Sequence, residues 1–232
     1  MRETITLRKR IAILSSQLEE NYQANFMQGF LAKAFAFDYD VCTFATYRKY
    51  QDTSEREVGE TSIFSLIDYD AFDGVVVLPE TLQTPGLMLT LEQDFREKFQ
   101  GKILYVDRKS DEYNYIMLDH YHPIKRMIAH LIEEHGIKDI MYLTGPRYNA
   151  HSEQRLQGFL DCMKEHDIDV REDQIFYGDY WYDGGRDMVK KLFDDGRALP
   201  QAIACANDLM AVGVAEALAE RGVHVPEDIA VI

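Results

Sequence analysis

The sequence predicts an α/β protein in which parallel strands alternate with helices in doubly wound lobes. Three observations support this prediction: seven short apolar runs recur along the 232 residues, helical patterns fall between them, and one polar stretch divides the runs into two sets. Because parallel strands must be joined by crossover connections, usually helices, this alternation favours an open parallel sheet over an antiparallel one.

Each apolar run is short and uninterrupted, and a polar turn follows it. This pattern is typical of strands that are buried on both faces of a parallel sheet. The runs are "IAIL" (11–14), "VCTFAT" (41–46), "GVVVLP" (74–79), "KILYVD" (102–107), "DIMYLTG" (139–145), "QAIACAN" (201–207) and "IAVI" (229–232). Right-handed crossovers then place helices on both faces of each sheet.

The segments between the runs carry helix signals. Residues 24–37 repeat apolar side chains at helical spacing, which gives a one-sided stripe. The next clear helix opens with Pro123 and closes before Gly136, the usual positions for proline and glycine at the two ends of a helix.

The last helical pattern follows a polar pair, Asn207 and Asp208, and ends before Gly222. An acidic residue near the start and a glycine beyond the end both favour a helix. We expect Asp208 to cap this helix, which leaves Asn207 free to face a ligand.

The stretch 107–123, "DRKSDEYNYIMLDHYHP", separates four predicted strands from the three that follow. It is polar, aromatic and rich in turn residues, and it has no long helical stripe. We interpret it as a crossing between two sheets with a ligand cleft between the lobes. The predicted boundaries are an N-terminal tail over 1–10, an N-terminal lobe over 11–117 and a C-terminal lobe over 118–232.

Composition limits the partners of the chain. Lys and Arg total 25 against 40 Asp and Glu, and the net charge of -15 repels the phosphate backbone of nucleic acids. The three cysteines are far apart and odd in number, which argues against a disulfide framework. No apolar run reaches the length of a membrane span, and the run 11–14 is too short for a secretory signal. We therefore predict a soluble, cytoplasmic protein without a membrane partner.

Polar side chains gather where the predicted strands end, the edge at which open parallel sheets bind ligands. The candidate ligand-binding residues found in this way are Ser15, Gln17, Tyr22, Gln23, Glu80, Arg155, Tyr180, Asn207 and Asp208. Their hydroxyls, amides, carboxylates, rings and guanidinium suit a polar small molecule held by hydrogen bonds and stacking.

Each candidate also has a purely structural interpretation. Asn207 and Asp208 can cap the helix that follows them. Arg155 can pair with a surface carboxylate, and the aromatic run 180–182 can pack in the core. No single residue decides between the two interpretations.

The sequence lacks the common catalytic motifs. The patterns G-x-S-x-G, G-x-x-x-x-G-K-[ST] and H-E-x-x-H do not occur. The stretch "DHYH" (119–122) could hold a metal, but ligand types crowded into one turn more often mark an exposed loop. Cys205 lies between two alanines in a predicted buried strand, where a thiol is usually inert. We predict no catalytic residue, no metal site and no cofactor.

Several segments together resemble the effector-binding core of LacI/GalR-type bacterial regulators, which share the two-lobed, type I fold of periplasmic sugar-binding proteins. No segment is specific alone, and their order and spacing carry the resemblance over nearly the whole chain. They are "VDR" (106–108), Asp119, "HLIEEHGIKDIMYLTGP" (130–146), "RLQGF" (155–159), "GD" (178–179), "ANDLMAVG" (206–213) and "VPEDIAVI" (225–232).

The resemblance implies roles for five residues. Arg155 would clamp polar groups of an effector, Tyr180 would stack on it or wall it, and Asn207 would contact it. Tyr22 would line the same pocket, and His151 would add a polar side chain. The resemblance also implies a small polar effector such as a sugar, a homodimer, and DNA contact only through a domain that is not present in this chain.

The sequence departs from the family pattern in three places. Only residues 1–10 precede the first strand, where the regulators carry a helix-turn-helix and a hinge helix. The family continues beyond "VI" (231–232) with a ligand-contacting acidic pair and a return to the first lobe, so we expect the N-terminal lobe to be incomplete. The turn "EEHGIKDI" (133–140) is one residue longer than usual and resembles sensor domains that precede a GGDEF diguanylate cyclase or a kinase.

The sequence thus predicts the small-molecule sensing domain of a LacI-like regulator or related signalling protein, which signals by a conformational change between its lobes. Three alternatives are left: the sensor half of a diguanylate cyclase or kinase, a solute-binding transport receptor, and a free-standing enzyme.

Overall fold

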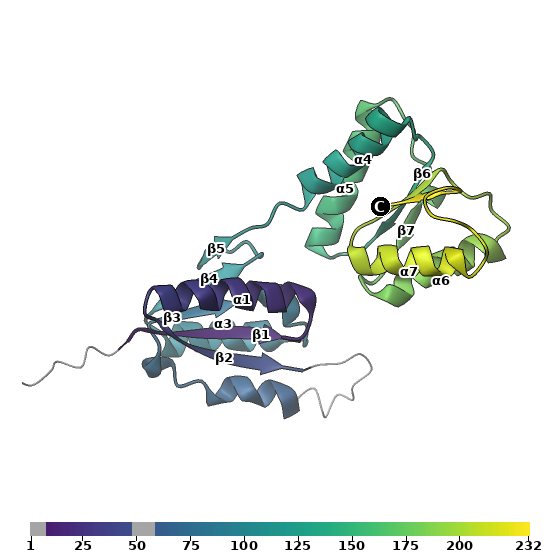
Figure 1. The fold of residues 1–232 in the computed structure, drawn as a ribbon. Coiled ribbons are helices and arrows are strands. Elements are labelled where there is room, and N and C mark those ends of the chain that lie inside the picture. The colour runs from purple at the N-terminus through teal and green to yellow at the C-terminus, as the bar shows by residue number, and fades with distance from the viewer. Residues whose placement is uncertain (1–7, 48–58) are drawn as a thin grey trace, which may run out of the picture. The chain divides into compact units, whose positions relative to one another are not determined.

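The computed structural model describes residues 8–47 and 59–232, and it divides the chain after Leu118 into two compact units (Figure 1). The first unit runs to Leu118 and the second runs from Asp119 to Ile232. Residues 1–7 of the predicted N-terminal tail lie outside the described residues.

The first unit is built on five parallel strands in the order β2-β1-β3-β4-β5. The strands are β1 (Arg10–Ser16), β2 (Asp40–Thr46), β3 (Gly74–Val77), β4 (Lys102–Val106) and β5 (Asn114–Ile116). The helices are α1 (Asn21–Ala36) and α3 (Leu87–Lys98), with short 3-10 turns η1 (Ser62–Leu66), η2 (Tyr69–Ala71) and η3 (Pro79–Thr81).

Alternation along the strands divides the core of the first unit into two layers. Ile13 and Val76 pack with side chains of α1 such as Phe30, and Leu14 and Val77 join a second cluster with side chains of α3. The continuous apolar strands of the sequence are therefore explained by a sheet that is covered on both faces.

The second unit repeats this plan with four parallel strands in the order β7-β6-β8-β9. The strands are β6 (Ile140–Thr144), β7 (Ile175–Tyr177), β8 (Ala202–Cys205) and β9 (Ala230–Val231). The helices are α4 (Tyr121–His135), α5 (Ala150–Glu165), α6 (Tyr182–Asp194) and α7 (Asp208–Ala219), with the 3-10 turn η4 (Glu172–Gln174).

Paired helices cover the sheet of the second unit: α4 packs against α5, and α6 packs against α7 (Figure 1). The pair α6 and α7 is close because Gly213 has no side chain, and a Cβ atom there would meet the backbone carbonyl of Tyr182. Gly136 ends α4 in a left-handed conformation with φ 66°, as the sequence indicates.

The prediction of two doubly wound parallel sheets is confirmed, but two strands were not predicted. β5 lies in the stretch interpreted as a crossing, so the first sheet has five strands rather than four. β7 was also missed, so the second sheet has four strands rather than three. Both are three-residue edge strands with exposed or partly exposed side chains, and each lies in a stretch rich in polar and turn residues. None of the described helices is long and apolar enough to cross a membrane.

Candidate functional site

The carboxyl ends of β1 and β3 in the first unit carry a cluster of hydroxyl groups that bond one another. The Ser15 and Thr81 hydroxyls are 3.3 Å apart, and the Thr81 hydroxyl also accepts the Ser16 backbone N–H at 3.1 Å. Thr46 donates its hydroxyl to Ser16 Oγ at 2.8 Å. Ser15 is fully buried and already bonded, so its predicted ligand contact would require it to leave these partners.

Two glutamines were predicted at this edge, and hydrogen bonds from both join neighbouring segments of the chain. Gln23 is buried and donates from Nε2 to the Ser16 carbonyl at 3.1 Å, which ties α1 to the end of β1. Gln17 has a left-handed backbone with φ 53°, and its backbone N–H donates to the Thr46 carbonyl at 2.8 Å. Their observed contacts therefore explain the local turn after β1.

Tyr22 and Glu80 lie together at this edge with more accessible side chains. Tyr22 is 41% exposed, and burial of its ring together with the charges of Asp107 and Glu80 raises the pKa of its phenol to about 12. Glu80 accepts a 2.8 Å hydrogen bond from Arg108 Nε, and its negative charge contributes to the raised pKa of Tyr22. The phenol is therefore a neutral donor at neutral pH, next to an acidic group.

In the second unit, Arg155 of α5 points to the carboxyl end of β8. Its Nη1 donates to the Ala206 carbonyl at 3.0 Å, and its Nη2 lies 3.1 Å from His120 Nδ1. The guanidinium carbon also lies 5.4 Å from the centre of the Tyr180 ring, within range of a cation–π contact. These contacts hold the cation partly buried at the sheet edge, rather than paired with a surface carboxylate.

The ring of Tyr180 rests against the turn that follows β6. A Cβ atom at Gly145 would overlap this ring, so the glycine allows the ring to approach the backbone. Tyr180 itself has a left-handed backbone with φ 71°, which is unfavourable for a residue with a large side chain. Burial raises the pKa of the Tyr180 phenol, and the charge of Arg155 opposes that rise.

The structure reverses our expectation for the polar pair before α7. Asn207, not Asp208, is the N-cap: its Oδ1 accepts the Met210 backbone N–H at 3.0 Å. Its Nδ2 donates to the Tyr180 carbonyl at 2.7 Å, so both ends of the amide have partners. Asp208 is the first residue of the helix and is exposed. The cap requires the extended backbone that precedes the helix, and only Asn207 has it.

His151 lies in the first turn of α5 and stacks on His120, with ring centres 4.2 Å apart and an interplanar angle of 25°. His120 is buried and shares its Nδ1 with Arg155. The second unit thus brings Arg155, Tyr180, Asn207 and His151 to one end of its sheet, together with His120, which the sequence did not single out.

The other residues weighed in the sequence have structural partners. Asp119 accepts the backbone N–H groups of Tyr121 and His122 at 3.1 and 3.0 Å, so part of "DHYH" starts α4. Cys205 is buried, and burial raises the pKa of its thiol to about 12, which suppresses the reactive thiolate.

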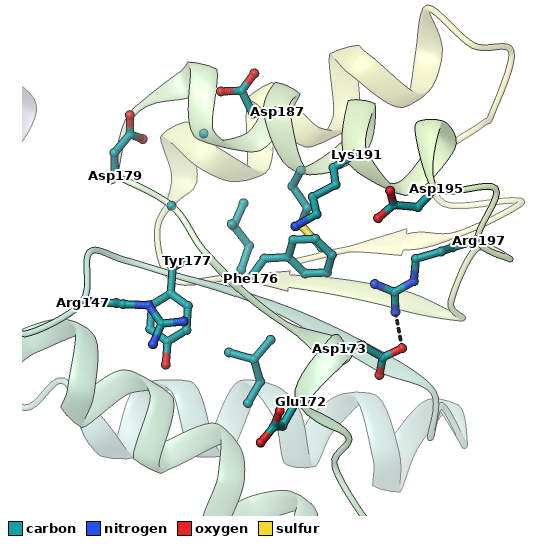
Figure 2. Close-up of a pocket in the computed structure, with 15 residues that line it drawn as sticks. Arg147, Glu172, Asp173, Phe176, Tyr177, Asp179, Asp187, Lys191, Asp195 and Arg197 are labelled. Carbon is teal, nitrogen blue, oxygen red and sulfur yellow. Dashed lines mark hydrogen bonds and ion pairs between the residues drawn. The ribbon is translucent and has the colours of Figure 1, made fainter.

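A groove of about 680 Å³ lies elsewhere on the second unit, along the edge strand β7 (Figure 2). The guanidinium carbon of Arg147 lies 3.6 Å from the centre of the Tyr177 ring. Arg197 Nη2 donates a hydrogen bond to Asp173 Oδ2 at 2.8 Å. Figure 2 shows Lys191 beside the Phe176 ring, and Lys191 Nζ lies 5.7 Å from the centre of that ring. None of the predicted ligand-binding residues lines this groove.

Comparison with known proteins identifies the relatives of the chain. Residues 128–232 match the family described as periplasmic binding protein-like domain. The HTH-type transcriptional repressor PurR of Glaesserella parasuis is 33% identical over 54% of this chain and 36% of its own length. PurR of Pectobacterium carotovorum is 25% identical over 97% of this chain and 62% of its own length. The regulator AscG of Escherichia coli is 29% identical over 69% of this chain and 46% of its own length.

Solved structures share the fold. The transcription regulator CcpA of Lactococcus lactis superposes with a TM-score of 0.74 at 19% identity, over 97% of this chain and 78% of that one. A sugar-binding LacI-family regulator of Escherichia coli, solved with phosphate, gives 0.71 at 24% identity over 96% of this chain and 77% of that one. The matches confirm the predicted resemblance to the effector-binding core of LacI/GalR-type regulators. The match spans only 36–62% of the length of the three curated relatives.

Proposed function

We propose that this chain is the small-molecule sensing part of a cytoplasmic transcriptional regulator related to LacI. The observation that carries the proposal is the cluster at the carboxyl edge of the second sheet, where Arg155 is held over Tyr180 beside the amide of Asn207. Curated relatives with this segment are repressors and regulators of transcription.

The chemistry of the cluster suits a polar, uncharged or anionic molecule such as a sugar. Arg155 offers several N–H donors in a planar fork, and its carbonyl and histidine partners leave part of that fork for a ligand. The Tyr180 ring gives a flat apolar surface for stacking. In the first unit, Tyr22 and Glu80 supply a phenol donor and a carboxylate acceptor at the equivalent sheet edge.

We further propose that effector binding stabilises one conformation of the chain, and that a homodimer transmits this change to DNA through a separate domain. The relatives are described as HTH-type regulators, which favours a DNA-binding output over a diguanylate cyclase or kinase. Their function also favours a binding role over an enzymatic one for these residues.

The test is a thermal-shift screen of the purified chain with D-ribose, D-glucose, adenosine and guanosine. A compound present at one hundred times its Kd should stabilise the folded state by about 2.7 kcal/mol, which raises Tm by several degrees. Arg155→Ala should abolish this rise, measured against the variant's own Tm, because it removes the donor fork.

Arg147→Ala is the matched control, since Arg147 also stacks on a tyrosine but belongs to the groove beside β7. It should keep the ligand-induced rise in full. An equal rise in the Arg155 variant would exclude the role of Arg155, and no rise with any of the four compounds would count against the sensing function.

A further inference from the structure

One core position of the second sheet carries a polar group. Tyr142 is the central residue of β6, where it lies between Ile175 of β7 and Ala204 of β8. The residue is fully buried, and no hydrogen-bond partner for its hydroxyl is found among the described residues. A buried hydroxyl without a partner destabilises a fold, so its presence calls for a reason.

The environment of the ring places Tyr142 on the α5 side of the sheet. Its ring stacks on Phe159 of α5, with centres 4.7 Å apart and an interplanar angle of 7°. Two residues further along β6, the Thr144 hydroxyl lies 3.0 Å from that of Ser152 on the same helix. Phe159 is one helical turn after Arg155, so the Tyr142 ring packs against α5 one turn from Arg155.

Electrostatics agrees with this placement. Burial raises the pKa of the Tyr142 phenol, and the nearby charge of Arg155 opposes the rise. The ionisable groups of Tyr180 and Cys205 add to the rise of this pKa. The hydroxyl therefore stays protonated at neutral pH, and the charge of Arg155 acts on it.

Another buried tyrosine shows how such a hydroxyl is normally satisfied. Tyr105, at a core position of β4, donates to Glu92 at 3.0 Å. The hydroxyl of Tyr69, in the first unit, also has no hydrogen-bond partner in the described parts of the chain, but its ring lies among those of Phe95 and Phe99. Tyr142 differs from Tyr69 because its neighbours include the guanidinium of a candidate binding site.

We propose that Tyr142 becomes an effector-contacting residue: its hydroxyl is closed to solvent in this structure, and the conformation that the effector stabilises exposes it, so that it donates a hydrogen bond to the bound small molecule. This inference rests on the proposed sensing function. Arg155 and Tyr142 are then two donors on one side of the molecule. The group of the effector that lies against them is a hydrogen-bond acceptor, such as a sugar oxygen, a carbonyl or a ring nitrogen, and an ammonium group is excluded there.

The substitution Tyr142→Phe tests this role because it removes only the oxygen. Without effector, the variant should have a Tm equal to or above that of the parent chain, since the lost hydroxyl had no partner. In calorimetric titrations with D-ribose, D-glucose, adenosine and guanosine, the compound that binds the parent chain should bind the variant about threefold to tenfold more weakly.

Tyr69→Phe is the control, because it removes an unpartnered buried hydroxyl that is remote in sequence from the cluster. Tyr69→Phe should leave the affinity for the bound compound unchanged. Its effector-free Tm should be equal to or above that of the parent chain, as for Tyr142→Phe. A variant Tyr142→Phe with lower Tm and unchanged affinity would show a purely structural hydroxyl and overturn the inference, while the sensing function would stand. Failure of the parent chain to bind any of the four compounds would count against the sensing function, and against this inference with it.

Discussion

The two units of this protein share one backbone plan but differ in how they use polar groups at the sheet edge. In the first, the hydroxyls of Ser15, Ser16, Thr46 and Thr81 are bonded to each other and to backbone carbonyls. In the second, an arginine is held by a carbonyl and a histidine, and the Tyr142 hydroxyl beneath it has no partner among the described residues. The first unit therefore uses these hydroxyls to hold its own strand ends together, whereas the second places a guanidinium with further N–H donors at the sheet edge.

The groove beside β7 shows that a concave surface and the predicted ligand-binding residues lie at different places on the second unit. It is large, and its cations contact a carboxylate or aromatic rings, as Arg197 does with Asp173 and Arg147 with Tyr177. The predicted ligand-binding residues of the second unit gather instead in the Arg155 cluster. Concave shape and binding chemistry are therefore separate properties of this molecule.

The largest expected difference between the units concerns helix packing. Gly213→Ala should destabilise the second unit by about 3 kcal/mol, because its new Cβ would meet the Tyr182 carbonyl on α6. Gly29→Ala, in the exposed interior of α1, meets nothing within 4 Å and should stabilise the first unit by about 0.5–1 kcal/mol. Urea unfolding followed by Trp181 fluorescence reports the second unit, and far-UV circular dichroism reports both. Equal behaviour of the two variants would show that α6 and α7 are not in such close contact.

The next effect separates Asn207 from Asp208. Asn207→Ala removes the cap of α7 and the donor to the Tyr180 carbonyl, and should cost about 1.5 kcal/mol. Asp208→Ala removes only a favourable charge in the first turn, and should cost about 0.5 kcal/mol. The same fluorescence-detected unfolding measures both. A larger loss for Asp208→Ala would restore the capping role that the sequence suggested for it.

A smaller effect tests the saturated edge of the first unit. Thr46→Val removes the hydroxyl that donates to Ser16 Oγ, and should cost about 1 kcal/mol in circular-dichroism-detected unfolding. Thr43→Val, on the same strand but exposed, should change stability by no more than about 0.5 kcal/mol. If the two variants lose the same stability, the hydroxyl cluster does not contribute as its geometry indicates.

The smallest effect is a pH dependence confined to the second unit, which contains all seven histidines of the chain. His166 follows α5, and its bonds to the Cys162 carbonyl at 2.8 Å and to Glu133 at 3.0 Å raise the pKa of the imidazole. A raised folded-state pKa adds stability that is complete below the unfolded value of about 6.5 and is lost as pH rises through the folded value.

His166→Gln should therefore lose more stability at pH 5.5 than at pH 8. The difference should stay below about 1 kcal/mol, because Glu133 is largely exposed and solvent screens the pair. Urea midpoints at the two pH values measure it, and His224→Gln, whose ring is more exposed, supplies the baseline. A loss that is larger at pH 8 would contradict the assigned direction.

Much of the fold could be predicted because its central strands carry their burial in their sequence. The run 11–14 became β1, and the run 201–207 contains β8, since both strands are covered on two faces. The edge strands β5 and β7 could not be predicted in this way, because each has only three residues and their side chains are exposed or partly exposed.

The candidate site was predictable only in part. The structure places Arg155, Tyr180 and Asn207 at the edge of one sheet, and their ligand contacts stay a prediction. The sequence did not reveal that Asn207 is the cap, because the choice between neighbouring polar residues depends on backbone conformation. The sequence predicts Tyr142 only as part of the apolar run 139–145. Nothing in the sequence indicates whether a buried hydroxyl finds a hydrogen-bond partner.

The sequence by itself determined the α/β class, the succession of buried strands and the kind of side chain that stands at their ends. Those properties depend on local periodicity and on turn residues, which short segments encode. Tertiary structure decided which of these polar groups are satisfied and which are not. That outcome depends on neighbours far apart in the chain, such as Arg155 with Ala206, and only folding brings those neighbours within hydrogen-bonding distance.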